Sequence, residues 1–384
     1  MNPPNLLCLS LVGVLLGLSA GSRAAEPALG SPAGTVPLYI GTYTGPGKSQ
    51  GIYLSHLDLA TGTLSEPQLA AKTVNPSFLA QHPSHKFLFA NNEIGNFKGK
   101  NGAATGFAID GATGKLTEIN QVSSGGPGPC HLSFDRDGKH LLIANWGGGS
   151  FAVIPVGDDG KMAELSCFVQ DDTTKQQPRA HCIQFDPASK FVLGNDAGLD
   201  RILVFKFDPA KGVLSPNDPP FVETAKGAGP RHLAFHPNGK WAYDINEANS
   251  TLTAYAWDGE HGVLKEIDTK STLPKSFEGK NSCAEVQVHP NGKFVYGSNR
   301  GDDSIVGFEI DPKSSELKFV GNTKSGGKMP RNFALDPSGS WLLAANQDSD
   351  NIVVFKVDAQ TGELKPNGKS ISLSAPVCLT FVSP

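Results

Sequence analysis

Hydrophobic and polar positions follow a pattern that recurs six times along the chain. Each copy has a short apolar run, Asp or His, usually Pro, a turn, a second apolar run and then Asn or Asp. The Asp or His positions, called anchors here, are His82, Asp135, Asp186, His236, His289 and Asp336. Successive anchors are 53, 51, 50, 53 and 47 residues apart. A period near 50 residues built from short strands is typical of a β-propeller, with one four-stranded sheet per period.

A second repeat follows each of the six pairs of apolar runs, and one further copy precedes the first pair, so the number of copies gives the number of blades. Its seven copies have a turn, usually with Asp and Gly, before Leu or Met: Asp58-Gly62-Leu64, Asp110-Gly114-Leu116, Gly160-Met162, Asp208-Gly212-Leu214, Asp258-Gly262-Leu264, Asp311-Leu317 and Asp358-Gly362-Leu364. The missing seventh inner strand is expected at the C-terminus, because Ser383 lies 47 residues after Asp336. Its expected partner is the segment 36–45, and this pairing of N- and C-terminal strands closes the ring without open sheet edges. We therefore expect an all-β fold, a seven-bladed β-propeller over residues 36–384.

Residues 1–25 lie outside the repeat and are predicted to be a signal peptide. Leu6–Ala20 is an apolar run of 15 residues, too short for a comfortable bilayer span. It leads into Ser22-Arg23-Ala24, a small-x-small cleavage pattern, although no Lys or Arg precedes it. The alternative is a buried hydrophobic segment. The signal-peptide reading predicts a periplasmic or secreted protein with no membrane association after cleavage.

Composition and charge exclude several classes of function. The formal net charge is −4 with both signs scattered along the chain, so no basic stripe indicates nucleic-acid binding. Nucleotide-binding loops and nucleophile elbows are absent from the sequence. Five cysteines follow the leader without CxxC pairing, and no His and Cys fall at ligand spacing. We expect buried free thiols, no metal and no other cofactor, while the oligomeric state stays open.

Positions at which the blades differ are the candidates for function. Eleven residues after the anchors, where the second strand should end, stand Glu93, Trp146, Ala197, Glu247, Arg300 and Gln347. Five residues before the anchors, where the first strand should begin, stand Ser77, Cys130, His181, Arg231, Ala284 and Arg331. The next positions hold Phe78, His131, Cys182, His232, Glu285 and Asn332. Antiparallel pairing places these slots at one mouth of the ring, whereas the recurring anchor histidines are expected to cap backbone groups.

The residue types at this mouth suit acid–base chemistry on an oxygen-containing substrate. Arg231, Arg300 and Arg331 can hold a carboxylate, a phosphate or a developing oxyanion through forked hydrogen bonds. His181 can exchange a proton with water near neutral pH, and Glu247 can orient an arginine or act as a second acid or base. No activated Ser or Cys nucleophile is evident. The structural alternative is an ion-pair network that only locks neighbouring blades together.

Three segments carry a resemblance to a known family. AHCIQFDPASKFVLGNDAGLDRI (180–202), GPRHLAFHPNGKWAYDINEANSTL (229–252) and VHPNGKFVYGSNRGDDSI (288–305) resemble the lactonase family. These seven-bladed propellers include bacterial 6-phosphogluconolactonase and, more distantly, the fungal carboxymuconate cyclase. The similarity runs over about residues 36–384 and implies a lactone-handling site at one end of the central channel.

The resemblance also implies roles for single residues. It carries the family's catalytic groups over to His181, Arg231, Glu247 and Arg300. Candidate substrate-binding residues are Arg331, Asn332, His131 and Arg179, the last of which stands where many members have a His. The implied activity is hydrolysis of a small sugar lactone, either an aldonolactone or 6-phosphogluconolactone. The arginines then stabilise the oxyanion, His181 activates water and Glu247 holds the arginines. A cyclase-like lactone isomerase and a non-catalytic exported binding propeller are the alternatives.

Overall fold

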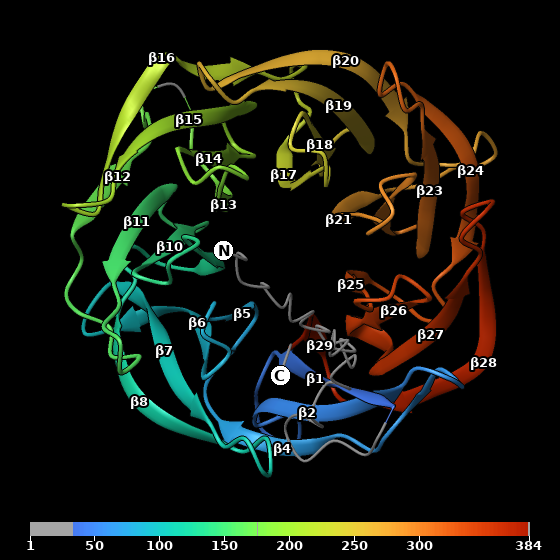
Figure 1. Cartoon of the computed structure of the whole chain (residues 1–384), viewed down its shortest axis with the longest axis horizontal. Helices are drawn as coiled ribbons and strands as arrows, with labels where there is room; N and C mark the ends of the chain where they lie inside the picture. Colours follow the sequence, from blue (N-terminus) through green and yellow to red (C-terminus); the bar gives the residue numbers. More distant parts are fainter. Residues whose placement is uncertain (1–33, 175, 383–384) are drawn as a thin grey trace, which may run out of the picture.

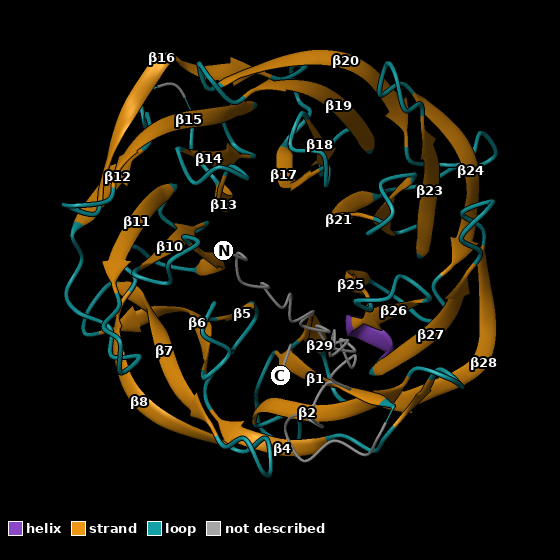
Figure 2. Cartoon of the chain, viewed as in Figure 1, coloured by secondary structure: helices purple, strands orange, loops and turns teal. Residues whose placement is uncertain are grey.

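The computed structural model of the chain describes residues 34–174 and 176–382. Seven sheets stand as blades around one central axis, which confirms the expected seven-bladed β-propeller (Figure 1). Within the described ranges a single 3₁₀ turn, η1 (Gln347–Ser349), is the one helical element (Figure 2). No helix in this part of the chain has the length and apolarity needed to cross a membrane. The predicted signal peptide (1–25) and Ser383 lie outside the described residues.

Each blade is an antiparallel sheet that runs from the channel to the outer rim (Figure 1). The innermost strands are β29 (Pro376–Phe381), β5 (Leu79–Gln81), β9 (Pro129–Phe134), β13 (Ala180–Phe185), β17 (Pro230–Phe235), β21 (Ser282–Val288) and β25 (Pro330–Leu335). The second strands are β1 (Thr35–Thr42), β6 (Phe87–Phe97), β10 (His140–Asn145), β14 (Phe191–Asp196), β18 (Trp241–Asn246), β22 (Phe294–Arg300) and β26 (Trp341–Asn346). The third strands are β2 (Gly51–Asp58), β7 (Asn101–Ile109), β11 (Ser150–Pro155), β15 (Arg201–Asp208), β19 (Thr251–Asp258), β23 (Ser304–Ile310) and β27 (Asn351–Val357). The outermost strands are β3 (Thr63–Leu64) with β4 (Gln68–Lys72), β8 (Leu116–Ser123), β12 (Cys167–Gln170), β16 (Val213–Glu223), β20 (Val263–Ser271), β24 (Leu317–Lys324) and β28 (Leu364–Ser372).

The ring is closed by a blade made from both ends of the chain, as the sequence predicts. β1 pairs antiparallel with β29, and Leu38 lies opposite Phe381 in this register. Gly41 sits at the irregularity in this pairing, where a Cβ atom would lie 2.3 Å from the carbonyl oxygen of Pro76. A side chain at this position would displace backbone, so the closure needs glycine. The pairing completes the seventh blade and closes the ring.

The hydrophobic cores lie between neighbouring blades. One core joins Leu142 and Phe151 of the β9–β12 blade to Ile183 and Val192 of the β13–β16 blade, all with almost no exposed surface. Second strands such as β14 are buried along their whole length, because both of their faces contact a neighbouring blade. The apolar runs that mark the repeat are therefore dictated by two-sided burial.

The anchor histidines join neighbouring blades, in agreement with their expected structural role. The Nε2 atoms of His82, His236 and His289 each lie 2.8 Å from a glycine carbonyl oxygen of the next blade. The Nδ1 atom of each accepts a backbone N–H from its own turn, so Nε2 carries the proton and donates. Both ring nitrogens are thus used by the scaffold.

Asp244 on β18 and Asn195 on β14 form a fully buried polar pair between two blades. Asn195 Nδ2 donates to Asp244 Oδ1 at 2.5 Å, while Asp244 Oδ2 and Asn195 Oδ1 have no partner. Burial raises the pKa of Asp244 well above its usual value, against a smaller opposing effect of the Asn195 hydrogen bond. A protonated Asp244 avoids a buried charge and turns its Oδ2 into a hydrogen-bond donor.

Asp244→Asn should therefore stabilise the fold, and increasingly so as the pH rises above about 4. An unfolded Asp ionises near pH 3.9 whereas the folded carboxyl keeps its proton, so wild-type stability falls as the pH rises through this range. Asparagine offers the same donor and acceptor without a charge. We expect a gain on the order of 1 kcal/mol in the free energy of unfolding at pH 7, and a smaller one at pH 4, in urea titrations. A difference independent of pH would contradict a protonated Asp244.

Candidate active site

The positions at which the blades differ lie together at one mouth of the channel because of the strand register. Pro230 at the start of β17 pairs with Asn246 at the end of β18, and Ser282 of β21 pairs with Arg300 of β22. The slot residues therefore sit where each innermost strand begins beside the end of its neighbour. Arg231 and Arg300, from different blades, lie within reach of one shared carboxylate there.

Glu247 holds two arginines together across two blades. Its Oε1 accepts a hydrogen bond from Arg300 Nη2 at 2.6 Å, and its Oε2 lies 3.4 Å from Arg231 Nε. Burial opposes ionisation of Glu247, but Arg231 and Arg300 outweigh burial and keep its pKa below the usual value. The carboxylate is therefore charged at neutral pH and fixes both guanidinium groups.

Both guanidinium groups are also anchored to backbone and still have unused donors. Arg231 Nη1 donates to the carbonyl oxygen of Ala284 at 2.5 Å, and Arg300 Nη2 donates to that of Cys283 at 2.8 Å. The Nε atom of Arg300 is buried without a hydrogen-bond partner, and that of Arg231 has only the 3.4 Å ion-pair contact with Glu247. Burial, followed by the repulsion of Arg300, lowers the pKa of Arg231 to about 10, which leaves it charged at neutral pH. Rigid cationic donors of this kind suit a carboxylate, phosphate or oxyanion ligand.

His181 lies on β13 beside this cluster and is 5% exposed. Burial, then the positive charge of Arg231 and the neighbouring His232, lower its pKa well below the usual value. The imidazole is therefore neutral near pH 7 and able to accept a proton. Its Nδ1 atom is buried and has no hydrogen-bond partner.

Backbone contacts fix the entry into β13 and so the position of His181. The N–H of Arg179 donates to Asp196 Oδ1 at 2.8 Å, and the N–H of Ala197 donates to the carbonyl oxygen of Arg179. The pairing of β13 with β14 is irregular between Ala180 and Cys182, which is where His181 stands. Such a bulge changes the direction of a side chain relative to its neighbours.

Arg179 lies at the mouth in a separate contact. Its guanidinium carbon is 4.0 Å from the ring centre of Trp146, a cation–π contact across two blades. Trp146 is 41% exposed, so part of its ring is open to solvent. Arg179 therefore extends the mouth on the side away from Glu247 rather than joining the Arg231–Glu247–Arg300 cluster.

Arg331 forms a third group with Glu93 and Tyr43. Arg331 Nη2 lies 3.7 Å from Glu93 Oε2, and the Tyr43 hydroxyl donates to the same oxygen at 2.8 Å. The Arg331 guanidinium also lies 5.3 Å from the Tyr43 ring centre. Burial raises the pKa of the Tyr43 hydroxyl, which stays protonated as a donor. The structure therefore adds Tyr43 to the mouth.

Tyr43 could have been found from the register of the closing blade. Its N–H donates to the carbonyl oxygen of Ala375, one residue before β29, just as the N–H of Glu247 donates to that of Gly229, one residue before β17. Tyr43 thus occupies the seventh copy of the slot that holds Glu93 and Glu247. The comparison by anchors missed it because this blade draws its two inner strands from opposite ends of the chain.

His131 and Asn332 belong to a buried layer beneath the mouth, together with His232 and Glu285. His232 Nδ1 lies 3.2 Å from Glu285 Oε2, and Asn332 Nδ2 donates to the same oxygen at 2.5 Å. The His131 and His232 ring centres are 5.3 Å apart. A cavity of about 10 Å³, room for the centre of one water molecule, lies between this layer and Arg231 and Arg331. Over the described ranges, no group of three or more His, Cys, Asp or Glu side chains could hold a metal ion.

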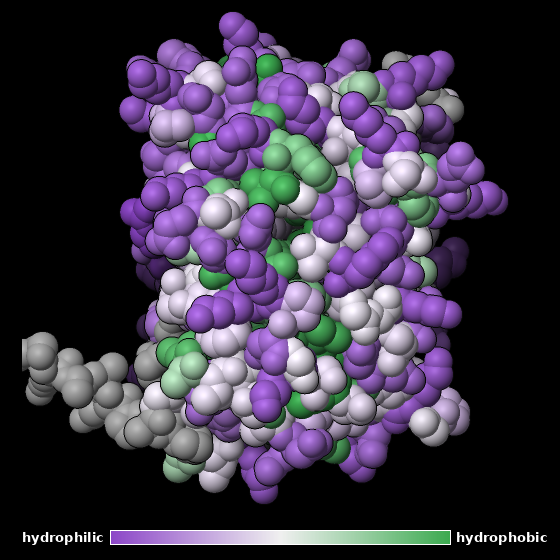
Figure 3. All heavy atoms as spheres, turned by 90° about the vertical axis from the view of Figure 1, so that its right-hand side faces the viewer, coloured by the Kyte–Doolittle hydropathy of each residue, from purple (hydrophilic) through white to green (hydrophobic). Residues whose placement is uncertain are grey.

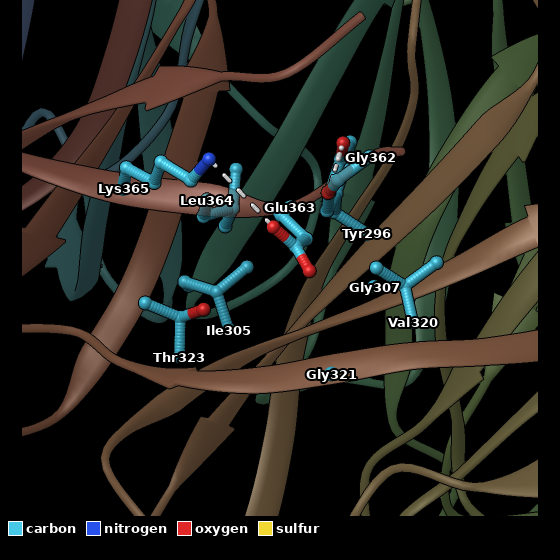
Figure 4. A pocket seen from close by; sticks show the side chains of 10 residues that line it. All are labelled: Tyr296, Ile305, Gly307, Val320, Gly321, Thr323, Gly362, Glu363, Leu364 and Lys365. Atoms are coloured by element: carbon cyan, nitrogen blue, oxygen red, sulfur yellow. Dashed lines mark hydrogen bonds and ion pairs between the residues drawn. The ribbon is translucent and has the colours of Figure 1, made fainter. Parts of the chain in front are cut away.

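A separate hollow of about 310 Å³ lies on the outer rim between β23–β24 and β28. Tyr296, whose hydroxyl donates to the carbonyl oxygen of Gly362, and the Glu363–Lys365 pair line it (Figure 4). The rim on this side is mostly hydrophilic, with hydrophobic atoms in furrows (Figure 3). Since the hollow contains one surface ion pair and no converging buried charges, the mouth is the better candidate site.

Comparisons with known proteins show what the chain is similar to. A family model described as "Lactonase, 7-bladed beta-propeller" matches residues 37–381. A protein named 6-phosphogluconolactonase from Bacillus subtilis (strain 168) is 36% identical over 303 residues, covering 78% of this chain and 84% of that protein. A second protein of that name, from Formosa agariphila, is 33% identical over 311 residues, covering 78% of this chain and 86% of its own length. The solved structure of a periplasmic gluconolactonase from Pseudomonas aeruginosa is similar with a TM-score of 0.85 at 34% identity, covering 91% of this chain and 99% of that one.

Proposed function

Because the chain belongs to the seven-bladed β-propeller lactonase family, we propose that it is a hydrolase that opens a sugar lactone at the mouth of its channel. One observation carries this proposal. Two arginines from different blades, with side chains almost fully buried, share Glu247 beside a neutral histidine. Such a set supplies an oxyanion site and a base in one place.

The proposed reaction uses these groups in order. Arg231 and Arg300 bind the lactone carbonyl oxygen, and their charge stabilises the oxyanion that forms when water adds to the carbonyl carbon. His181 takes a proton from the attacking water and then returns it to the ring oxygen as the carbon–oxygen bond breaks. Glu247 keeps the two guanidinium groups in place. The products are the ring-opened acid and an unchanged enzyme.

The substrate we favour is an unphosphorylated aldonolactone. The predicted signal peptide favours export from the cytosol, and sugar phosphates are not expected outside it. The similar Pseudomonas aeruginosa protein is described as a periplasmic gluconolactonase, which supports both the compartment and the substrate. The Bacillus subtilis relative is named for a phosphorylated lactone, so 6-phosphogluconolactone is the second candidate.

Reaction in ¹⁸O-labelled water tests hydrolysis against isomerisation. Glucono-δ-lactone and 6-phosphogluconolactone are each incubated with the protein at a concentration that makes spontaneous opening negligible. Hydrolysis predicts one labelled oxygen in the new carboxyl group of the acid, seen by mass spectrometry. An unlabelled product isomeric with the substrate would contradict hydrolysis and would favour a cyclase-like isomerisation by proton transfer.

A further inference from the structure

The buried layer beneath the mouth contains acid–base groups that the reaction above does not use. Glu285 stands on β21 and His232 on β17, and both are almost fully buried. Glu285 Oε2 lies 3.2 Å from His232 Nδ1 and accepts from Asn332, while its Oε1 accepts the N–H of Val286. Each carboxylate oxygen therefore has a donor, and the imidazole is oriented by the carboxylate.

The next ring along this line is His181 itself. The ring centres of His181 and His232 are 5.0 Å apart with the planes at 63°. His232 Nε2 and His181 Nδ1 are both buried without a hydrogen-bond partner. The contact is edge-to-face, and no hydrogen bond joins the two rings in this arrangement. These two orphaned nitrogens lie on adjacent rings, and a rotation of one or both rings is needed for them to form a hydrogen bond.

We propose that Glu285 and His232 form a proton relay that orients His181 and takes up its charge during lactone hydrolysis. This inference rests on the proposed function. In the relay, the rings rotate so that His181 Nδ1–H donates to His232 Nε2, while His232 Nδ1–H donates to Glu285. As His181 Nε2 takes a proton from water, its Nδ1 proton shifts to His232 Nε2 and the His232 Nδ1 proton shifts to Glu285. All three transfers reverse when the ring oxygen is protonated.

The surroundings of Glu285 favour such a carboxyl group. Burial raises its pKa to about 7, whereas Arg231 and His131 act in the opposite direction. Facing groups come from β17 (Arg231, His232), β9 (His131) and β25 (Asn332). A carboxyl group that changes protonation near neutral pH can both accept and return a proton. If this buried layer only filled the channel, it would not need a titratable group, since buried charges cost stability.

Glu285→Gln and His232→Gln test the relay. Both are positioning residues, so we expect kcat to fall about 10- to 100-fold while KM stays within about twofold. The double variant should lose little more than either single one, because the two residues act as one unit. The acidic limb of the kcat/KM profile against pH should also shift in Glu285→Gln. The matched control is Asp244→Asn, another buried carboxyl on the neighbouring strand β18, which should leave kcat unchanged.

Histidine ring signals give a readout that does not depend on turnover. In long-range ¹H–¹⁵N spectra the relay predicts that His181 carries its proton on Nδ1 and that Glu285→Gln shifts the signals of His181 as well as His232. Single variants that keep kcat within twofold of an active wild type would overturn the relay. His181 signals that do not change in Glu285→Gln would overturn it even if the wild type opened no lactone, which separates this failure from that of the proposed function.

Discussion

His181→Ala is expected to lower kcat for lactone opening at least about 100-fold, because general base catalysis contributes roughly 10²- to 10⁴-fold. His181 is neutral near pH 7 and adjoins the arginine cluster, where an attacking water needs a proton acceptor. The variant removes the acceptor and leaves Arg231, Glu247 and Arg300 in place. Steady-state rates with glucono-δ-lactone, corrected for spontaneous opening, measure the effect.

The matched control is His261→Ala, which removes an exposed histidine of the outer rim that pairs with Asp258. It should leave kcat unchanged. Thermal unfolding of both variants verifies that the propeller is intact. A folded His181→Ala with near-normal kcat would remove His181 from the role of base.

Arg231→Gln is expected to lower kcat by about 10²- to 10³-fold, the effect of removing one oxyanion donor. Its guanidinium is held by Glu247 and by the Ala284 carbonyl, so its donors are fixed before the substrate binds. Glutamine keeps a polar side chain but loses the charge. Arg231→Lys should recover little of the kcat lost in Arg231→Gln, since an ammonium group cannot reproduce the planar, forked donors of a guanidinium group.

Arg201→Gln is the control for charge loss, because Arg201 forms an ion pair with Asp171 outside the Arg231–Glu247–Arg300 cluster. Its expected effect on kcat is less than twofold. A loss in Arg231→Gln that is confined to KM would show that Arg231 binds the ground state only, and would contradict oxyanion stabilisation.

The fold was largely predictable because seven blades repeat one pattern. Two-sided burial makes the second strands apolar in every blade, and the anchor turn recurs because His or Asp must satisfy backbone groups there. The closing blade was also predictable, since β29 is the one inner strand missing from the repeat. Such periodicity allows the architecture to be predicted from local sequence patterns, without knowledge of long-range contacts.

The catalytic candidates were found where the repeat is broken, but their contacts were not. The strand register implied that Arg231, Glu247 and Arg300 share a mouth, and the ion pairs between them agree. The side-chain pairing of His232 with Glu285 depends on rotamers and on the irregular registers of β13, β17 and β21, which a slot comparison cannot supply. The site assignments themselves stay predictions until the variants are measured.

The hydrolase is tested most directly by the background-corrected rate at which the wild-type protein opens glucono-δ-lactone, measured beside 6-phosphogluconolactone and beside His181→Ala. We predict saturable turnover of at least one lactone by the wild type and its loss in the variant. A folded wild-type protein that accelerates neither lactone above the spontaneous rate would contradict the proposed hydrolase.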